Sequence, residues 1–251
     1  MNTPNTPLVT IITVVYNGEE FLQQTIDSVY NQTYKNIEYI IVDGASTDNT
    51  LEIIKCNEHK ITKWISEPDQ GLYDAMNKGI KMSSGELIGM INSDDWYELN
   101  AVELVLNAYQ KNQRKKIFHG DIRCVDSNNN LTIKRAKNNS FLLKYYGMVL
   151  NHPTMFIHKE NYKKFEYNIN LKSVADYQFV LENYLYNSDQ FCHIPEVISN
   201  FRLGGISARL TLKESLIENY LARKNARMNI IQRVFGIVLR ISIQSYNSIL
   251  K

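Results

Sequence analysis

Cysteines are few in this sequence, and long hydrophobic runs are absent. The 251 residues include only Cys56, Cys124 and Cys192, which stand far apart. Three cysteines at these spacings form neither a disulfide framework nor a zinc motif, which favours a reducing compartment. Because no stretch of about 18 uncharged apolar residues occurs, we expect no ordinary transmembrane helix. The N-terminus has no basic region before its short apolar run, so no signal peptide is expected either.

Two common phosphate-binding patterns are also missing. The sequence has no Gly-x-x-x-x-Gly-Lys loop and no Gly-x-Gly-x-x-Gly after its first apolar run, which argues against a P-loop ATPase and a dinucleotide dehydrogenase. The net charge is only +2, so no overall field points to a nucleic-acid partner. With 44% hydrophobic residues, the composition suits an ordinary globular protein with a sizeable core.

Strand-like and helix-like segments alternate through the first half of the chain. Residues 8–15, 38–43, 63–66 and 86–91 are apolar runs, several rich in β-branched residues, typical of strands covered on both faces. The segments between them have helical spacing, and Ser46 or Thr47 is the expected cap of the second helix. This alternation predicts an α/β fold with a mainly parallel, doubly wound sheet and helices on both faces. The second half is less regular: we expect helices at 100–111 and 175–186 and strands at 116–126, 130–136, 152–159 and 193–205.

Polar side chains follow three of the predicted strands where each strand ends. Tyr16 follows the first strand, Asp43 ends the second, and Asn92, Asp94 and Asp95 follow the fourth. Because ligands of such sheets sit beyond the carboxyl ends of the strands, we expect these side chains to share one site. Turn formation or helix capping explains each position singly but not their convergence.

Two adjacent carboxylates repel each other unless something compensates their charge. At Asp94 and Asp95, a divalent cation, Mn²⁺ or Mg²⁺, is the candidate, because both take oxygen ligands and leave room for phosphate oxygens. Such an ion neutralises a diphosphate leaving group. A nucleotide bound through a metal and without a glycine-rich loop is what a nucleotide-sugar transferase requires.

Three stretches together resemble glycosyltransferase family 2, which has the GT-A fold. They are TIITVVYNGEEFLQQTIDSVYNQTYKNIEYIIVDGASTDNT (10–50), EPDQGLYDAMNKGIKMSSGELIGMINSDD (67–95) and VADYQFVL (174–181). The resemblance is clear over residues 8–96, weaker to about 205, and absent from the tail. No single stretch is specific, but all of them in this order make a strong signal. The resemblance implies transfer of a sugar with inversion at the anomeric carbon.

The resemblance also implies roles for individual residues. Tyr16 would lie against the nucleotide base, and Asp43 would hydrogen-bond the base edge, as expected for uracil. Asp94 would face the ribose and the metal, while Asp95 would be the main metal ligand. Asp176 would be the base that accepts the proton of the acceptor hydroxyl, a role that an inverting displacement requires. A carboxylate in the first turn of a helix is the alternative reading of Asp176.

One departure from the family pattern and three further residues bear on the site. Family members often have aspartate where this chain has Asn92, which leaves two carboxylates for the metal. Asp69 caps a helix or contacts the donor, and Asn77 is grouped with it as a candidate donor-sugar or diphosphate contact. Arg202, with Gly204, Gly205, Ile206 and Ser207, is a candidate lid over the diphosphate or an exposed loop residue. His152 lines the acceptor pocket or has a structural role.

Basic charge gathers in the C-terminal tail. Residues 207–251 carry eight Lys and Arg against two Glu, a net charge of +6, which leaves −4 on residues 1–206. Within 228–245, Ile230, Val234, Val238 and Ile241 form an apolar stripe opposite a polar one. That pattern is typical of a helix lying in a membrane interface. Packing on the domain or on a second copy, as in a homodimer, is the alternative.

The sequence therefore predicts a GT-A domain over 1–206 followed by a basic amphipathic helical segment over 207–251. The expected donor is a nucleotide-sugar, with UDP as nucleotide, and the expected acceptor is a saccharide or lipid-linked saccharide in surface-polysaccharide synthesis. The expected location is cytoplasmic, peripheral at the inner face of the cytoplasmic membrane. The alternatives are a sugar nucleotidyltransferase, for which residues 16–18 lack the Gly-rich basic signature, and a binding module without turnover.

Overall fold

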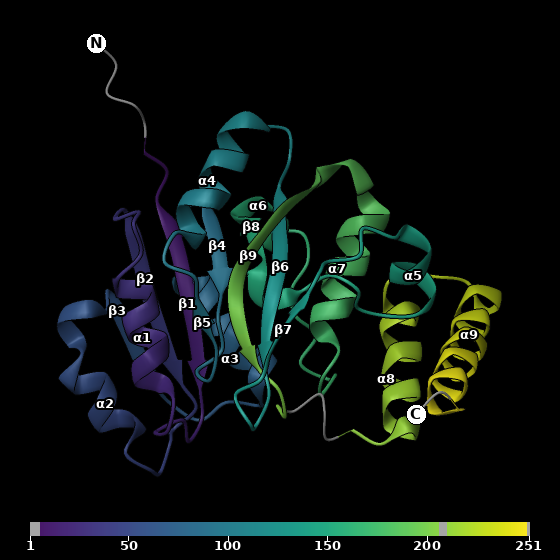
Figure 1. The fold of residues 1–251 in the computed structure, drawn as a ribbon, viewed down its shortest axis with the longest axis horizontal. Coiled ribbons are helices and arrows are strands. Elements are labelled where there is room, and N and C mark those ends of the chain that lie inside the picture. The colour runs from purple at the N-terminus through teal and green to yellow at the C-terminus, as the bar shows by residue number, and fades with distance from the viewer. Residues whose placement is uncertain (1–5, 206–209, 250–251) are drawn as a thin grey trace.

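A computed structural model describes residues 6–205 and 210–249, and within them nine strands form one sheet. The order along the sheet is β3-β2-β1-β4-β8-β6-β9-β5, with β7 paired to β6. Helices lie on both faces of the sheet, and two further helices follow at one end of the molecule (Figure 1). This architecture confirms the predicted α/β class with a C-terminal helical segment.

The first half is the parallel part of the sheet. Strand β1 (Val9–Val15) pairs in parallel with β2 (Ile37–Asp43) and β4 (Leu87–Met90), and β2 pairs in parallel with β3 (Lys63–Ser66). The connections carry α1 (Leu22–Tyr30), α2 (Thr50–Cys56), η1 (Glu58–Lys60) and α3 (Leu72–Met82). All four predicted strands are confirmed. Since their carboxyl ends share one edge, the polar residues after β1, β2 and β4 come to the same side, which is the lower edge in Figure 1.

The second half adds mixed pairing. Strand β8 (Phe156–His158) runs antiparallel to β4 and to β6 (Ile117–Val125), while β9 (Phe191–Arg202) runs parallel to β6. Strand β5 (Trp96–Tyr97) pairs with β9, and β7 (Leu131–Lys134) with β6. The predicted strand at 152–159 was partly wrong, because it begins as the 3-10 turn η2 (His152–Thr154) around Pro153. The remaining elements are α4 (Ala101–Lys111), α5 (Ser140–Tyr145), α6 (Lys159–Tyr162), α7 (Ala175–Tyr186) and η3 (Ser188–Gln190).

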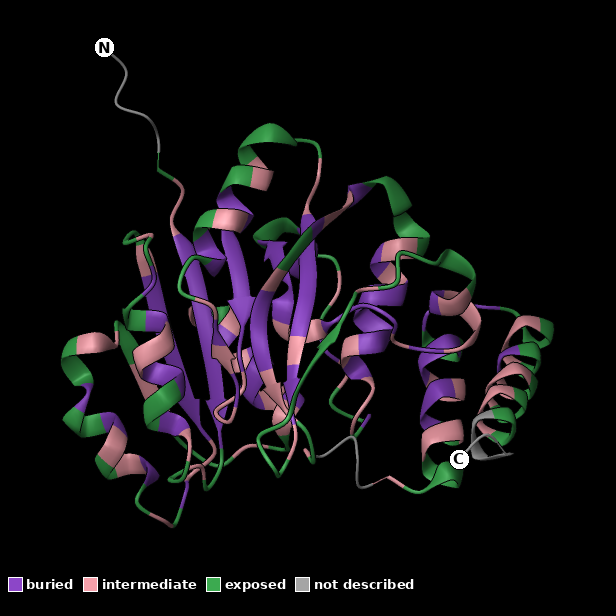
Figure 2. Cartoon of the chain, viewed as in Figure 1, coloured by how far each residue is buried: buried purple, intermediate pink, exposed green. Residues whose placement is uncertain are grey.

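Alternate residues of the central strands point to opposite faces of the sheet and belong to two separate core layers. Ile11 faces the layer with α1 and α4, whereas Ile12 faces the layer with α3 and α7, and both are almost completely buried. Figure 2 shows the central strands buried along most of their length. This two-sided burial explains why these strands read as continuous apolar runs.

The predicted cap of the second helix is wrong. Helix α2 begins at Thr50 with Asn49 before it, and Ser46 instead donates through its hydroxyl and its N–H to Asp43. The buried carboxylate of Asp43 offers this serine stronger hydrogen bonds than a helix end on the surface.

Two helices complete the described chain, α8 (Leu212–Asn225) and α9 (Ile230–Ile249). Helix α8 packs on α7, and α9 packs on α8 and α5. The predicted boundary between 206 and 207 lies outside the described residues, as do Ile206 and Ser207 of the predicted lid. Within the described ranges, no helix combines the length and the apolarity that crossing a membrane would need.

Candidate active site

The acidic pair lies where the chain leaves β4. Asp95 is fully buried, and its carboxylate accepts the backbone N–H of Arg202 at 3.0 Å and the side-chain amide of Asn92 at 3.4 Å. Burial, and then the neighbouring charge of Asp94, raise the pKa of Asp95 well above its usual range. Burial likewise raises the pKa of Asp94, although Arg202 opposes that shift. The fold thus holds two carboxylates where their mutual repulsion is poorly screened.

Arg202 reaches this pair from the end of β9. Its guanidinium lies 4.1 Å from the ring centroid of Phe21 and 4.8 Å from that of Trp96, and it donates to Gln24 at 2.5 Å. These two cation–π contacts and the hydrogen bond hold the group near Asp94 and Asp95. The structure therefore brings Arg202 to the acidic strand end, as a diphosphate contact would require.

The predicted nucleotide residues gather after β1 and β2. Tyr16 is 64% exposed, whereas Asp43 is fully buried and accepts from the Ser46 N–H at 3.0 Å and the Ser66 hydroxyl at 2.6 Å. A Cβ added to Gly44 would lie 2.5 Å from a carboxylate oxygen of Asp69 and 3.5 Å from the Tyr16 ring. The side chains of Tyr16 and Asp69 therefore both lie close to Gly44. The contact of Asp43 with a base stays a prediction.

On the acceptor side, two hydrogen bonds and one ring contact connect Asp176 to His152. The Tyr73 hydroxyl donates to Asp176 at 3.2 Å, and the Tyr73 ring stacks on Tyr167 with centroids 5.8 Å apart. The Tyr167 hydroxyl is 2.9 Å from Nε2 of His152. Burial lowers the pKa of His152, and the charge of Asp176 raises it in part. The predicted base and the predicted acceptor residue thus belong to one cluster.

Tyr73 and Tyr167 were not among the residues predicted from the sequence. Tyr73 stands in the first turn of α3, inside one of the stretches that carry the family resemblance, so its position was a usable signal. Tyr167 lies in an irregular segment that no spacing rule singles out.

Asn77 binds the backbone of Tyr167, a member of this cluster. Its amide donates to the carbonyl of Tyr167 at 2.8 Å and accepts the N–H of Tyr167 at 3.1 Å, and the residue is almost fully buried. Both amide atoms are therefore used on the backbone of Tyr167. The structure places Asn77 as a support of the acceptor side and does not bring it to Asp94 and Asp95.

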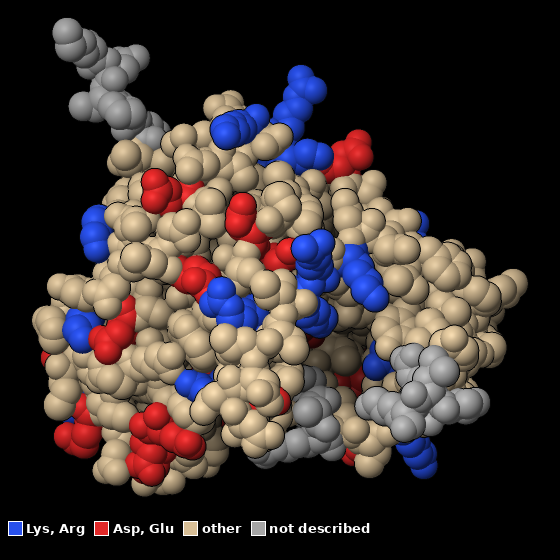
Figure 3. Space-filling model, viewed as in Figure 1, with Lys and Arg blue, Asp and Glu red and all other residues tan. Residues whose placement is uncertain are grey.

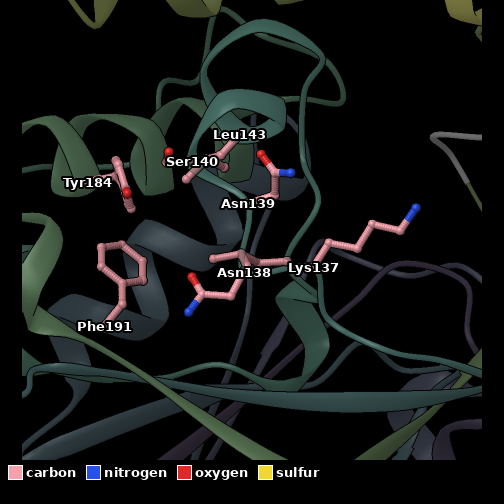
Figure 4. A pocket seen from close by; sticks show the side chains of 8 residues that line it. Lys137, Asn138, Asn139, Ser140, Leu143, Tyr184 and Phe191 are labelled. Atoms are coloured by element: carbon pink, nitrogen blue, oxygen red, sulfur yellow. The ribbon is translucent and has the colours of Figure 1, made fainter.

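A small pocket elsewhere does not compete with this site. It has a volume of about 10 Å³, on the scale of a single water molecule, so it holds no nucleotide-sugar. Figure 4 shows its labelled lining side chains, with Tyr184 and Phe191 facing the segment that precedes and opens α5. The lining residues are Lys137, Asn138, Asn139, Ser140, Leu143, Leu150, Tyr184 and Phe191.

The acidic pair fits a divalent cation that is shared with a ligand. Across residues 6–205 and 210–249, no three His, Cys, Asp or Glu side chains form a metal cluster by themselves. Mg²⁺ and related ions are commonly held by one or two carboxylates together with substrate phosphates and water. Burial raises the pKa of both Asp94 and Asp95, with the charge of Asp94 adding to the shift at Asp95, and a bound cation would stabilise the ionised form of both carboxylates.

The fold is shared with a solved structure. Staphylococcus aureus TarS, residues 1–349, in complex with UDP-GlcNAc superposes with a TM-score of 0.72 at 16% identity, over 93% of this chain and 71% of that one. At this identity the likeness establishes the fold alone.

The sequence comparisons reach further. A chondroitin synthase of Pasteurella multocida is 27% identical over 89% of this chain, which spans only 23% of that protein. An uncharacterized glycosyltransferase of Haemophilus influenzae is 27% identical over 98% of both chains. The sequence profile described as "Glycosyl transferase family 2" matches residues 10–174, well over half of the chain and the whole of the acidic strand end. The chain belongs to glycosyltransferase family 2.

Proposed function

We propose that this protein is an inverting glycosyltransferase that moves a sugar from a nucleotide-sugar to a hydroxyl group of a saccharide or lipid-linked saccharide. One relationship carries the proposal. The fold places the buried Asp95 and the partly buried Asp94 beside Arg202 at the strand ends, and places Asp176 in a separate cluster linked to α3. Asp94, Asp95 and Arg202 suit the departing diphosphate, and Asp176 suits the attacking hydroxyl.

The proposed step follows from these positions. The oxygen of the acceptor hydroxyl attacks the anomeric carbon while the bond from that carbon to the diphosphate oxygen breaks. Asp176 takes the proton of the hydroxyl as its oxygen becomes bonded to carbon. Asp94 and Asp95 would hold Mn²⁺ or Mg²⁺, which would supply positive charge for the diphosphate. Arg202 adds a cation near the same place, and its contacts with Phe21 and Trp96 hold it there before the reaction.

A UDP-sugar is the proposed donor. Tyr16, exposed after β1, offers a ring face to a base, and Asp69 lies beside it over Gly44. The structural neighbour TarS was solved with UDP-GlcNAc, which supports the choice of UDP. Relatives named chondroitin synthase support a role in capsule, O-antigen or exopolysaccharide synthesis.

We place the protein at the inner face of the cytoplasmic membrane, with α9 as its contact. Helix α9 turns its apolar side outward: Ile231 is 77% exposed, Val238 55% and Val234 48%. Its other side carries Arg240, which donates to the carbonyl of Tyr146 at 2.8 Å. Figure 3 shows few charged side chains over α9 on the visible face. The exposed Lys224 and Arg227 precede this outward apolar face in the chain, and the combination suits an anionic lipid surface, where a lipid-linked acceptor would be found.

The membrane contact is tested by vesicle sedimentation. Ile231→Glu combined with Val238→Glu should reduce binding to vesicles containing anionic lipid at least about fivefold, without lowering Tm. Leu131→Glu, at an equally exposed leucine on β7, is the matched control and should bind as the wild type does. Equal binding of all three proteins would remove the membrane from the proposal.

The donor site is tested by calorimetry. UDP, dTDP and GDP are titrated into the protein with Mn²⁺ and then with EDTA, using wild type and Asp95→Ala. Binding of UDP that needs the metal and disappears in the variant would support the donor site. If none of the three nucleotides binds in a metal-dependent way, Asp94 and Asp95 form only a turn, and the proposed chemistry fails. Asp176→Asn then separates an enzyme from a binding module, because it should lower kcat about a hundredfold or more, to a small residual rate, and leave UDP binding intact.

A further inference from the structure

We infer that α8, in the C-terminal segment, is a positioning element for Asp176, with Glu218 as its key residue. This inference rests on the proposed role of Asp176. Glu218 is almost fully buried, and its two carboxylate oxygens accept the backbone N–H groups of Lys172 at 2.7 Å and Ser173 at 2.9 Å. These N–H groups lie immediately before α7, whose second residue is Asp176.

Helix α7 lacks a side-chain cap of its own. Val174 stands at its N-cap position and offers no side-chain acceptor. Charge-assisted hydrogen bonds from backbone N–H groups to a carboxylate are strong, and a negative charge near a helix start is favourable. Glu218 does not cap α7; it fixes, from another helix, the backbone of the two residues that precede the N-cap position. The entry into α7, and with it the start of the turn that carries Asp176, depends on this contact.

Helix α8 also contacts the chain just after Asp176. The amide of Asn225 donates to Gln178 at 2.9 Å. The guanidinium of Arg223, which is fully buried, lies 5.7 Å from the ring centroid of Tyr177 and donates to the carbonyl of Lys144 at 2.9 Å. The Tyr177 hydroxyl donates to the same carbonyl at 3.2 Å. Contacts on both sides of Asp176 thus come from one helix.

This arrangement joins the C-terminal segment to the acceptor side of the site. The carboxylate of Asp176 accepts a hydrogen bond from Tyr73 of α3, and the backbone that leads into α7 is bound by Glu218 of α8. Displacement of a reacting group by about 1 Å can cost roughly a hundredfold in rate. Loosening the α7 entry should therefore lower kcat, while the donor residues after β1, β2 and β4 keep their positions.

The experiment compares Glu218→Gln with Glu214→Gln. The glutamine at 218 retains one carbonyl acceptor and leaves one N–H without a partner. Glu214 is exposed on the same helix and caps it through Thr211, so its variant controls for helix stability and for lost charge. With UDP-GlcNAc as the probe donor, Glu218→Gln should lower kcat about tenfold or more and leave the UDP dissociation constant unchanged. Glu214→Gln should leave kcat within about twofold, even where it lowers Tm.

Two further measurements decide between positioning and a general loss of structure. In the Asp176→Asn background, Glu218→Gln should cause no additional loss of kcat, since the group that it positions is gone. Amide hydrogen exchange should accelerate at residues 172–178 in Glu218→Gln and stay unchanged there in Glu214→Gln. Unchanged exchange at 172–178, or an undiminished effect of Glu218→Gln without Asp176, would overturn the inference. The exchange result needs no turnover, so it remains informative if the proposed function itself fails.

Discussion

The hydroxyl of Tyr73 donates a hydrogen bond to Asp176 at 3.2 Å, across 103 positions of the sequence. Tyr73 belongs to α3, which follows β3 in the parallel half of the sheet, and Asp176 belongs to α7. Burial, followed by the charge of Asp176, raises the pKa of Tyr73 well above its usual range. The tyrosine therefore stays protonated at neutral pH and acts as a donor. This contact joins α3, in the parallel half of the fold, to α7 on the acceptor side of the proposed site.

Replacing Tyr73 by phenylalanine should slow turnover without disturbing the donor. The variant removes one donor to a carboxylate but keeps the ring that stacks on Tyr167. A hydrogen bond to a charged group contributes about 1.5–3 kcal/mol, so a loss of roughly tenfold in kcat is expected. Initial rates and UDP titrations on the same preparations provide the measurement. A fall in UDP affinity equal to the fall in kcat would show that Tyr73 acts on the whole site instead of on Asp176.

Asp95 should destabilise the protein when no metal is present. In EDTA, Asp95→Asn is expected to raise Tm by about 2–4 °C, which corresponds to about 1 kcal/mol for a chain of this length. The variant removes a buried negative charge next to Asp94 but keeps an oxygen for the N–H of Arg202. The same variant should lose metal-dependent UDP binding, so its stability and its function should change in opposite directions. A lower Tm in EDTA would contradict this account.

The stability gain at Asp95 should depend on pH in a defined direction. Because the pKa of Asp95 is higher in the folded than in the unfolded protein, the folded state binds the proton more tightly. The contribution of this group is favourable below the unfolded-state value, near 3.8, and is lost as pH rises through the folded-state pKa. Thermal melting of wild type and Asp95→Asn in EDTA should therefore show a larger difference at pH 7.5 than at pH 4. A difference that grows as pH falls would have the wrong sign.

Local patterns predicted the parallel half of the fold well. The strands at β1 and β2 are continuous apolar runs because both faces are buried, and that requirement is visible within each segment. The acidic pair was also visible, since two adjacent carboxylates after a buried strand need compensation. The bounds of α7 agree with the predicted range of 175–186.

Contacts between distant segments were outside the reach of such patterns. Ser46 was expected to accept an N–H of the helix, but its hydroxyl and its N–H donate to Asp43, and the sequence does not show that this carboxylate lies within reach. The amphipathic pattern of the predicted tail helix does not say which side meets the protein. In the structure Arg240 donates to Ser215 of α8, and Gly236 lies against Arg223 of α8 and the carbonyl of Tyr145 in α5, so this side docks. A buried guanidinium is acceptable only when carbonyl partners are present, and these lie far away in sequence.

The absence of a side chain at Gly44 should matter for donor binding. A methyl group there would lie 2.5 Å from a carboxylate oxygen of Asp69, which is closer than two such atoms can approach, so Asp69 must move. Gly44→Ala is therefore expected to weaken UDP binding roughly tenfold in calorimetry with Mn²⁺. Because Asp69 is a partly exposed side chain, Tm should change little. Unaltered UDP affinity in this variant would remove Asp69 and its neighbour Tyr16 from the donor site.

Because of the way α9 packs, Gly236→Ala should lower Tm, although alanine forms helices more readily than glycine. On propensity alone, Gly236→Ala should stabilise α9 by about 1 kcal/mol. However, the new Cβ would lie 2.8 Å from the guanidinium carbon of Arg223 and 2.9 Å from the carbonyl oxygen of Tyr145. Neither atom can yield easily, because that carbonyl is backbone and Arg223 also donates to it at 2.6 Å. Overpacking of this kind costs about 1–3 kcal/mol, so the net effect should be a lower Tm.

Val238→Ala, on the exposed side of the same helix, should leave Tm almost unchanged. If Val238→Ala lowers Tm and Gly236→Ala raises it, α9 docks by its apolar side, and the outward face proposed for the membrane does not exist.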